Sequence, residues 1–165
     1  MTVLPDRLAP GLAVVFCGTA PGRVSAARGH YYAGPGNLFW PMLAEAGLTP
    51  RRLRPEEDAQ VTAYGIGLTD LAKDASGGDH EIPRAAYDVP RLLAAVGAVR
   101  PRALAFTSLT AGRLVLGRRA GAGMQARFGP LPGTVVWVLP SPSGRARGRF
   151  DAGPWRALGD WVRAA

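Results

Sequence analysis

Cysteine and histidine are scarce in this chain of 165 residues. Cys17 is the only cysteine, which excludes an intrachain disulfide and any metal site built on paired cysteines. The two histidines, His30 and His80, lie far apart in the sequence and have no cysteine partners. We therefore expect a protein in a reducing, cytoplasmic setting that uses no metal ion or other cofactor.

Long apolar runs are missing as well. No stretch approaches the roughly 20 consecutive apolar residues that a membrane span needs. The first ten residues hold one aspartate and two prolines before any apolar run begins, which is unlike an export signal. We expect a protein that neither enters a membrane nor is exported.

Acidic residues are outnumbered by basic ones. The chain has 12 Asp and Glu against 20 Lys and Arg, for a formal net charge of +8, and nearly all of the positive charge is Arg. The codon bias of a GC-rich genome would explain the excess of Arg over Lys, but not the sign of the net charge. A polyanionic partner is therefore expected.

Four short apolar runs are the candidates for buried strands, because each ends at polar residues, Gly or Pro. Helical patterns lie between them, and alternating strands and helices favour a mostly parallel sheet covered on both faces. At this length we expect one domain over residues 1–165, a three-layer α/β/α sandwich with a short, mostly parallel central sheet. The expected strands are Leu12–Cys17, Tyr64–Leu68, Ala103–Thr107 and Val135–Leu139.

Five segments have the residue spacing or the end signals of helices. Asn37 is expected to cap the first of them, and Pro90 and Pro154 suit the first turns of two others. The expected helices cover Leu38–Ala46, a segment from about Pro55, Tyr87–Val99, a segment opened by Ser108, and a segment from Pro154 through Val162.

Three loops are rich in Gly, Pro, Ser or Tyr: residues 18–22, 29–37 and 141–147. Each is interpretable as a plain linker. The first and third follow expected strands, however, and ligands of parallel sheets bind beyond the carboxyl ends of the strands. We therefore expect these loops to carry the functional site.

Two segments resemble motifs of one enzyme family. VVFCGTAPG, residues 14–22, resembles the first active-site motif of the uracil-DNA glycosylase superfamily, in which a strand delivers a Gly-x-Asn-Pro-Gly loop to the base pocket. LPSPSGRA, residues 139–146, is similar to the Asn-Pro-Ser-Gly-Leu-Ser loop that enters the DNA minor groove in its mismatch-specific uracil/thymine branch. Further segments extend the resemblance, in order, over nearly the whole chain: LAPGLAVVFCG, GPGNLFWPMLAEAGLTP, GIGLTDL and VVWVLPSPSG.

This resemblance implies a monofunctional DNA glycosylase of base excision repair. Such an enzyme flips uracil, notably from G·U mismatches, out of DNA and hydrolyses its N-glycosidic bond to leave an abasic site. The implied partner is double-stranded DNA containing uracil or mismatched bases, bound by a monomer in the cytoplasm, at the bacterial nucleoid. The residues implied to bind the base are Gly18, Thr19, Ala20, Ser25 and Tyr32.

Backbone N–H groups of the first loop would stabilise the leaving base, much as an oxyanion hole does. Tyr32 falls where the family places an aromatic that stacks on the flipped base, although a partly buried core aromatic is the alternative interpretation. Ala20 departs from the family pattern, because the related branch has an Asn there that holds the attacking water. A methyl group can neither orient nor polarise water.

Asp70 is the candidate for that missing catalytic role. GIGLTD brings a carboxylate to the end of an expected strand, where it could position water and stabilise a positively charged sugar. The alternative is that Asp70 caps a helical turn containing Leu71 and Lys73. Asp74 and Asp79, in a Gly-rich stretch, are weaker candidates.

The second motif implies a DNA-binding loop. Arg145 replaces the Leu that fills the gap left by the flipped base, and Ser143 matches a Ser that grips a phosphate. Gly144, Ala146 and Arg147 complete the expected DNA-binding set. A solvated basic loop that touches only phosphates is the alternative. Arg149 is expected to contact phosphate, and Thr107 and Ser108 to act only in capping a helix.

Two other functions compete with glycosylase activity. Because Ala20 lacks the water-holding amide, a lesion-binding protein with little or no catalysis fits the same motifs. A nucleotide-binding α/β domain fits less well, because neither GxGxxG nor GxxxxGK[ST] occurs in the 18–22 loop. The glycosylase hypothesis requires Gly18, Tyr32, Asp70 and the 143–147 loop to meet around one cavity that holds a pyrimidine.

Overall fold

The fold is built on one five-stranded sheet. A computed structural model describes residues 1–165, with every side chain except that of Arg147. The sheet has the order β2-β1-β3-β5-β4, in which the first four strands are parallel and β4 pairs antiparallel to β5. The strands are β1 (Val14–Gly18), β2 (Ile66–Asp70), β3 (Ala103–Phe106), β4 (Gly123–Met124) and β5 (Val135–Val138).

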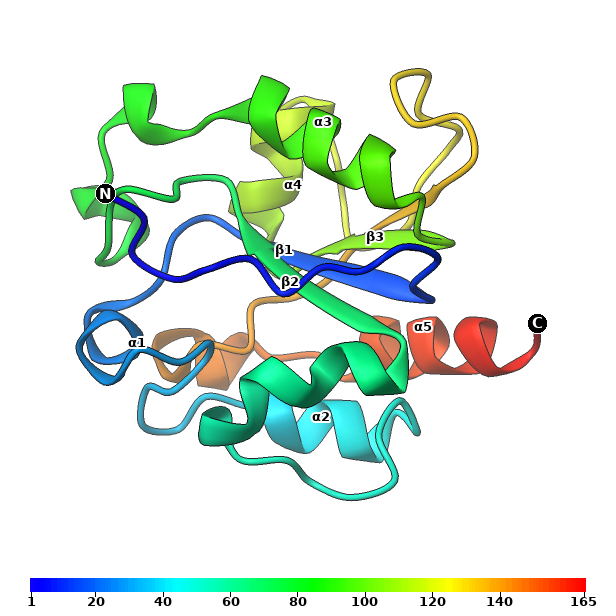
Figure 1. Cartoon of the computed structure of the whole chain (residues 1–165), viewed down its shortest axis with the longest axis horizontal. Coiled ribbons are helices and arrows are strands. Elements are labelled where there is room, and N and C mark those ends of the chain that lie inside the picture. Colours follow the sequence, from blue (N-terminus) through cyan, green and yellow to red (C-terminus); the bar gives the residue numbers. More distant parts are fainter.

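Helices cover both faces of the sheet, as Figure 1 shows. α3 (Val89–Val99) and α4 (Leu109–Leu116) lie on one face; α2 (Phe39–Glu45), the 3-10 helix η1 (Pro55–Tyr64) and α5 (Gly153–Arg163) lie on the other. α1 (Arg23–Arg28) and three short 3-10 helices sit in the loops: η2 (Asp79–Glu81), η3 (Arg84–Ala86) and η4 (Gly144–Arg149). The expected three-layer α/β/α sandwich with a mostly parallel sheet is confirmed.

Alternate residues of each strand enter two separate cores, because successive side chains point to opposite faces of a sheet. Phe16 and Ala105 pack with the aromatic residues of α2 and α5, whereas Cys17 and Phe106 pack with α3 and α4. The two cores explain why the strands are nearly continuous apolar runs rather than alternating patterns. They hold the strand ends at fixed positions relative to one another.

The four expected strands correspond within two residues to β1, β2, β3 and β5, whereas β4 was not expected; the difference at β2 bears on the site. β2 begins at Ile66 and ends at Asp70, two residues later than the Tyr64–Leu68 expectation. The cause is Gly65, which adopts a left-handed conformation (φ 76°) at the end of η1 and delays the strand. This shift places Thr69 and Asp70 inside the strand, next to β1.

The helix signals were largely correct. Ser108 caps α4, Pro90 lies in the first turn of α3, and the segment from Pro55 is a 3-10 helix. Asn37 forms its predicted capping bond one position early: its Oδ1 accepts the N–H of Phe39 at 2.9 Å, and the helix starts at Phe39. A helical turn capped by Asp70 is wrong, because residues 71–78 form bends and no helix.

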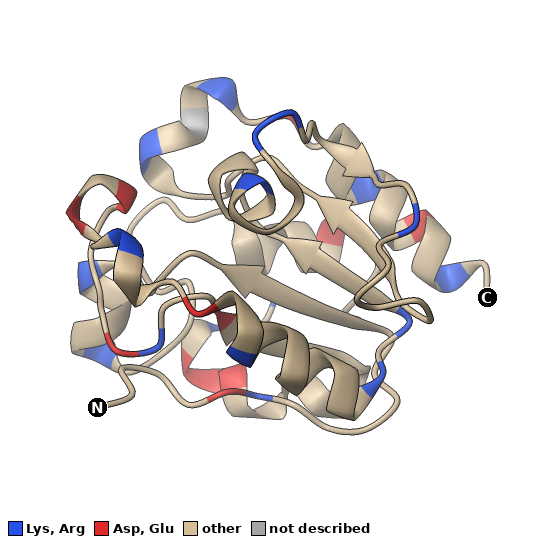
Figure 2. Ribbon diagram, turned by 90° about the horizontal axis from the view of Figure 1, so that it is seen from above, with Lys and Arg blue, Asp and Glu red and all other residues tan. Residues whose placement is uncertain are grey.

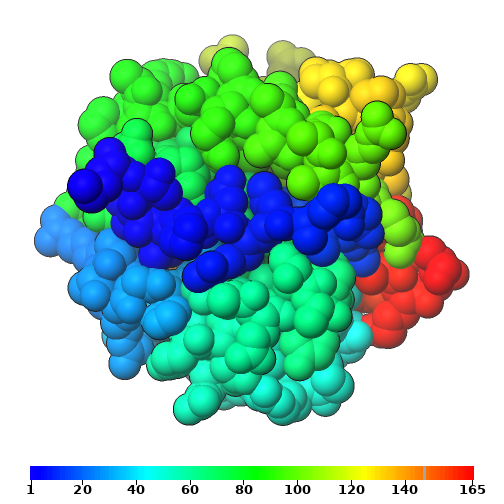
Figure 3. Space-filling view, viewed as in Figure 1, coloured from blue at the N-terminus to red at the C-terminus, as the bar shows by residue number. Residues whose placement is uncertain are grey.

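The N-terminal segment covers the β2 edge of the sheet. Arg7 and Leu68 exchange two backbone hydrogen bonds of 2.9 Å in an antiparallel bridge. In Figure 3 this segment runs across one face of the molecule, between the part that contains α3 and the part that contains η1. It brings Asp6 alongside the end of β2, where it hydrogen-bonds Thr69.

The chain reverses its winding direction between β1 and β3. The connection after β1 crosses the face that carries α2, and the connection after β2 crosses the opposite face through α3. A ligand-binding crevice is expected at such a switch point, outside the carboxyl ends of the two central strands. Gly18 and Thr107 mark these ends.

Candidate functional site

Gly18 and Asp70 stand side by side where β1 and β2 end. They are register partners in the parallel pair. A Cβ atom placed on Gly18 would come within 3.1 Å of Asp70 Oδ1, 3.4 Å of Thr107 Oγ1 and 3.5 Å of the Tyr32 hydroxyl. Three side chains from distant parts of the sequence therefore surround Gly18, and a larger residue at this position would crowd Asp70.

Tyr32 is held in an unusual backbone conformation at this point. Its φ of 53° lies in the left-handed region, which costs a non-glycine residue roughly 1–3 kcal/mol. The ring stacks on Phe39 with centroids 3.9 Å apart, and the hydroxyl lies 3.0 Å from Thr107 Oγ1. Burial raises the pKa of Tyr32, so the hydroxyl stays protonated. These contacts aim it toward Gly18 and Asp70.

Thr107 belongs to this cluster, although the sequence pointed only to helix capping. Ser108 alone caps α4, by accepting the N–H of Ala111 at 3.0 Å. Thr107 is 4% exposed, and its hydroxyl bonds Tyr32. Its position directly after the third parallel strand was the signal that could have found it.

Asp70 is the only acidic residue in this cluster, and its carboxylate is poorly compensated by hydrogen bonds. The residue is 3% exposed, and Oδ2 has no hydrogen-bond partner among the described residues. Burial raises the pKa of Asp70 from 3.8 to about 7; Lys73 and Arg91 lower it and Asp6 raises it. A carboxyl whose pKa is raised toward neutrality suits a general base or an electrostatic stabiliser.

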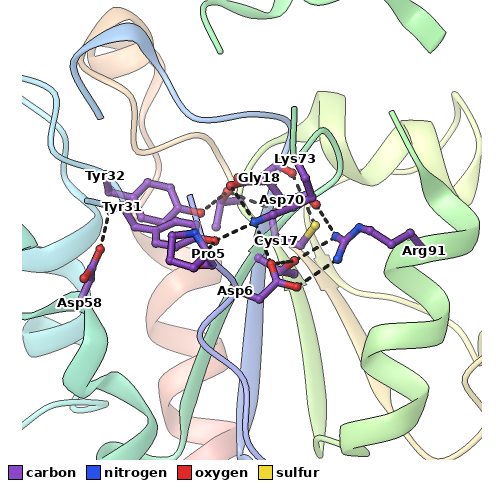
Figure 4. Close-up of polar contacts among 12 residues, drawn as sticks. Pro5, Asp6, Cys17, Gly18, Tyr31, Tyr32, Asp58, Asp70, Lys73 and Arg91 are labelled. Carbon is purple, nitrogen blue, oxygen red and sulfur yellow. Dashed lines mark hydrogen bonds and ion pairs between the residues drawn. The ribbon is translucent and has the colours of Figure 1, made fainter. Parts of the chain in front are cut away.

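Lys73, Asp6 and Arg91 form a polar network behind Asp70 (Figure 4). Lys73 Nζ lies 2.7 Å from Asp6 Oδ1 and 3.9 Å from Asp70 Oδ2. Arg91 bonds the other Asp6 oxygen at 3.0 Å and donates to the main-chain oxygen of Asp70 at 2.6 Å. The sequence argument missed all three residues.

The remaining predicted base-binding residues lie in the loop after β1 and in α1. Thr19 donates its hydroxyl to Asp79 Oδ1 at 2.7 Å, and Ser25 Oγ accepts the N–H of Ala33 at 3.0 Å. Ala20, between Thr19 and Pro21, is partly exposed. These side chains stabilise the loop itself, so their proposed contribution to base binding comes from the backbone.

Residues 77–81 cross over this loop. Gly77 donates its N–H to Pro21 at 2.9 Å, Asp79 bonds Thr19, and Glu81 pairs with Arg23. Asp79 therefore acts as a structural partner of the 18–22 loop. This contact was not foreseen, because the Gly-rich sequence around it shows no periodic pattern.

The second motif ends in the 3-10 helix η4, which contains its residues 144–146. Gly144 packs against the backbone of residues 35–36, where a Cβ would come within 2.7 Å of the Pro35 oxygen. Ser143 Oγ accepts the N–H of Arg145 at 3.3 Å, and Arg145 Nη1 reaches the side of Gly78. Ala146 donates its N–H to the Ser143 oxygen at 3.0 Å. In Figure 2, η4 lies at the edge of the molecule as a turn with basic residues.

The expected single cavity is only partly assembled. Gly18, Tyr32 and Asp70 come together, but their meeting point is packed with side chains, as the burial of Asp70 and Thr107 shows. The 143–146 segment instead contacts residues 35–36 and Gly78. The predicted role of Arg147 in DNA binding falls on a side chain outside the described ones.

A cavity of about 430 Å³ lies beside this site. Tyr32 is part of its wall, together with residues 33–34, 36–38, 40–41 and 52–55, which include Arg52 and Arg54. The cavity therefore adjoins the Tyr32 end of the site.

These features place the chain among α/β proteins in which polar side chains gather at the carboxyl ends of the central parallel strands. Within that class, the chain belongs to the uracil DNA glycosylase superfamily, whose family model matches residues 5–162. The fold is similar to the solution NMR structure of a protein from Methanosarcina acetivorans that is provisionally named a uracil DNA glycosylase. The TM-score is 0.67 at 24% identity, over 97% of this chain and 96% of the other. Membership makes the chain a DNA glycosylase at the family level, with DNA as its partner.

The residues that the structure describes lack two kinds of feature. No helix among them has the length and apolarity needed to cross a membrane. No three His, Cys, Asp or Glu residues gather there in a way that could hold a metal ion.

Proposed function

We propose that this protein excises uracil from double-stranded DNA, notably from G·U mismatches, as a monofunctional glycosylase similar to the mismatch-specific branch. The observation that carries the proposal is the buried carboxylate of Asp70 beside Gly18, whose Oδ2 accepts no hydrogen bond from the described residues. It occupies the switch point of a fold whose family acts on DNA. We further propose that residues 1–165 act as one domain and as a monomer.

Asp70 supplies the chemistry that Ala20 cannot. In the hydrolysis, a water oxygen bonds to the sugar carbon as the carbon–nitrogen bond breaks, and the bonding electrons leave with the base. The sugar becomes positively charged and the base negatively charged on the way to the transition state. An ionised Asp70 stabilises the sugar and accepts a proton from the water, while N–H groups near Gly18, Thr19 and Ser25 stabilise the base.

The base has to be flipped out of the duplex to reach these groups, at a cost of a few kcal/mol. Tyr32 offers a stacking surface, worth roughly 1–3 kcal/mol per base. Because one face of its ring already packs on Phe39, a base would have to stack on the other face. Since Asp70 is shielded from solvent, DNA binding must also displace the side chains that close the meeting point.

The proposed function is tested with a duplex oligonucleotide that contains one U·G pair, under single-turnover conditions. We expect abasic product from U·G, and less or none from the matched T·A duplex. Tight binding without any abasic product would contradict the enzyme and establish the lesion-binding alternative. Xanthine, hypoxanthine, thymine and ethenocytosine in several pairings then define the substrate range.

The proposed role of Arg145 leads to a difference between substrates. A guanidinium that fills the gap left by the flipped base acts only where an opposite strand exists. Arg145→Ala is therefore expected to slow excision from duplex U·G by roughly tenfold or more, the equivalent of about 1.4 kcal/mol, and to change single-stranded excision much less. Single-turnover rates on both substrates measure this.

Arg149→Ala is the matched control for this experiment. Arg149 lies in the same 3-10 helix and is exposed. Loss of a phosphate contact from Arg149 would weaken the binding of both substrates to a similar degree. Equal losses on duplex and single strands in Arg145→Ala would show that Arg145 also contacts only phosphate.

A further inference from the structure

Lys73 is the only lysine in a chain that otherwise uses arginine for its positive side chains. It lies in the loop after β2, with 10% of its side chain exposed. A strongly hydrated ammonium is costly to bury, so a buried lysine needs specific partners. Their arrangement indicates what this lysine does.

Two groups fix the ammonium from the side opposite Asp70. Asp6 Oδ1 lies 2.7 Å from Nζ, and the Tyr31 hydroxyl accepts a hydrogen bond from Nζ at 3.1 Å. Both are anchored in turn, because Tyr31 bonds the Pro5 oxygen and Asp6 is bonded by Thr69 and Arg91. The lysine therefore has little freedom to move.

The third neighbour of Nζ is Asp70 Oδ2, which accepts no hydrogen bond from the described residues and lies 3.9 Å away. This distance is too long for a hydrogen bond but short for a Coulomb interaction in a buried site. We infer that Lys73 is a positioning residue for Asp70: held by Asp6 and Tyr31, its ammonium governs how much of the Asp70 carboxylate is ionised. The inference rests on the proposed function, because Asp70 is the group assigned to the chemistry there.

The other groups that face Asp70 come from every element around it. Arg91 of α3 bonds its main-chain oxygen, Asp6 of the N-terminal segment is the nearest acid in the network, and Cys17, Tyr32 and Thr107 are neutral. Lys73 is the strongest of the charges that favour ionised Asp70, whereas burial opposes ionisation. Without Lys73, burial would keep the carboxyl protonated at neutral pH.

The inference is tested by titrating Asp70 directly. Carbon-13 NMR of labelled aspartate carboxyls, assigned with Asp70→Asn, gives the midpoint in wild type, Lys73→Met and Lys73→Arg. Removing an opposite charge at this range is expected to raise the Asp70 midpoint by roughly 1–3 pH units in Lys73→Met. Lys73→Arg keeps the charge and should stay closer to wild type. An unchanged midpoint in folded Lys73→Met overturns the inference.

A second measurement needs no substitution of Lys73. Because the chain has one lysine, nitrogen-15 labelling of lysine gives a single side-chain ammonium signal. We expect this signal to shift with pH near the Asp70 midpoint in wild type and to lose that inflection in Asp70→Asn. An inflection that persists in Asp70→Asn belongs to another group and overturns the inference.

Excision rates separate this inference from the proposed function. If uracil is excised, the rate of Lys73→Met should follow the raised midpoint, with its acid limb moved to higher pH. Coupled NMR midpoints without excision of any base would contradict the proposed function and leave the pairing of Lys73 with Asp70 intact. Excision with uncoupled midpoints would overturn the role of Lys73 alone.

Discussion

Asp70→Asn is expected to lower single-turnover excision of uracil from a U·G duplex by roughly 10²–10⁴-fold, the range that a well-placed general base contributes. The amide nearly matches the shape of the carboxyl, so the packing around residue 70 is preserved. It cannot accept a proton from water, and it carries no charge to stabilise the sugar. Quenched-flow or manual time courses with excess enzyme measure the rate.

The pH dependence of the wild-type rate should agree with this assignment. Because the ionised form is the active one and burial raises the pKa of Asp70 to about 7, the rate should rise between about pH 6 and pH 8 and then level off. Asp70→Asn should lose this dependence. The residual rate of the variant then reports what backbone groups and stacking contribute by themselves.

Asp74→Asn is the matched control for this substitution. Asp74 lies four residues further along, with 71% of its side chain exposed, and pairs with the N-terminal amine. It should keep a rate close to wild type. If Asp70→Asn retained that rate as well, Asp70 would be removed from the mechanism and the proposed catalytic chemistry would have to come from elsewhere.

The architecture could be predicted from the sequence because the strands are buried on both faces. Runs such as residues 14–17 and 103–106 are apolar without alternation. In a chain with helices between the runs, that pattern indicates parallel strands buried on both faces. Capping residues such as Ser108 added the helix starts. The first and last residues of a strand were predicted less accurately where a single glycine sets them, as Gly65 does for the start of β2.

The candidate site was predictable only where strand ends carry its residues. Gly18 and Asp70 each end a parallel strand, so their proximity follows from the sheet. Asp6 and Lys73 meet because the N-terminal segment pairs with β2, a contact for which no sequence pattern was visible. The closed state of the site depends on side-chain packing around Tyr32, which no local pattern specifies.

A buried carboxylate that is suited to catalysis lowers the stability of the folded protein. Asp70 is buried and Oδ2 has no hydrogen bond among the described residues, so ionising it in the folded protein costs more than in the unfolded chain. Lys73 offsets part of that cost and leaves the pKa at about 7. The same arrangement that keeps the carboxylate reactive therefore lowers the stability of the protein at neutral and alkaline pH.

Asp70→Asn should consequently stabilise the protein while it slows excision. A folded-state pKa above the ordinary 3.8 means that the favourable contribution of Asp70 is present below about pH 4 and is lost as pH rises through about 7. The difference between these pKa values corresponds to roughly 4 kcal/mol once the group is fully ionised. The variant should thus gain up to that amount over wild type above about pH 8 and lose the gain near pH 4.

Urea unfolding of wild type and Asp70→Asn at several pH values between 4 and 8.5 measures this gain as a difference in free energy of unfolding. Asp74→Asn supplies the baseline, because an exposed carboxylate should change stability little and without a midpoint near pH 7. A difference between Asp70→Asn and wild type that stays flat with pH would show that Asp70 ionises as easily in the folded protein as in water. That result would remove the electrostatic basis for placing the catalytic base at this residue.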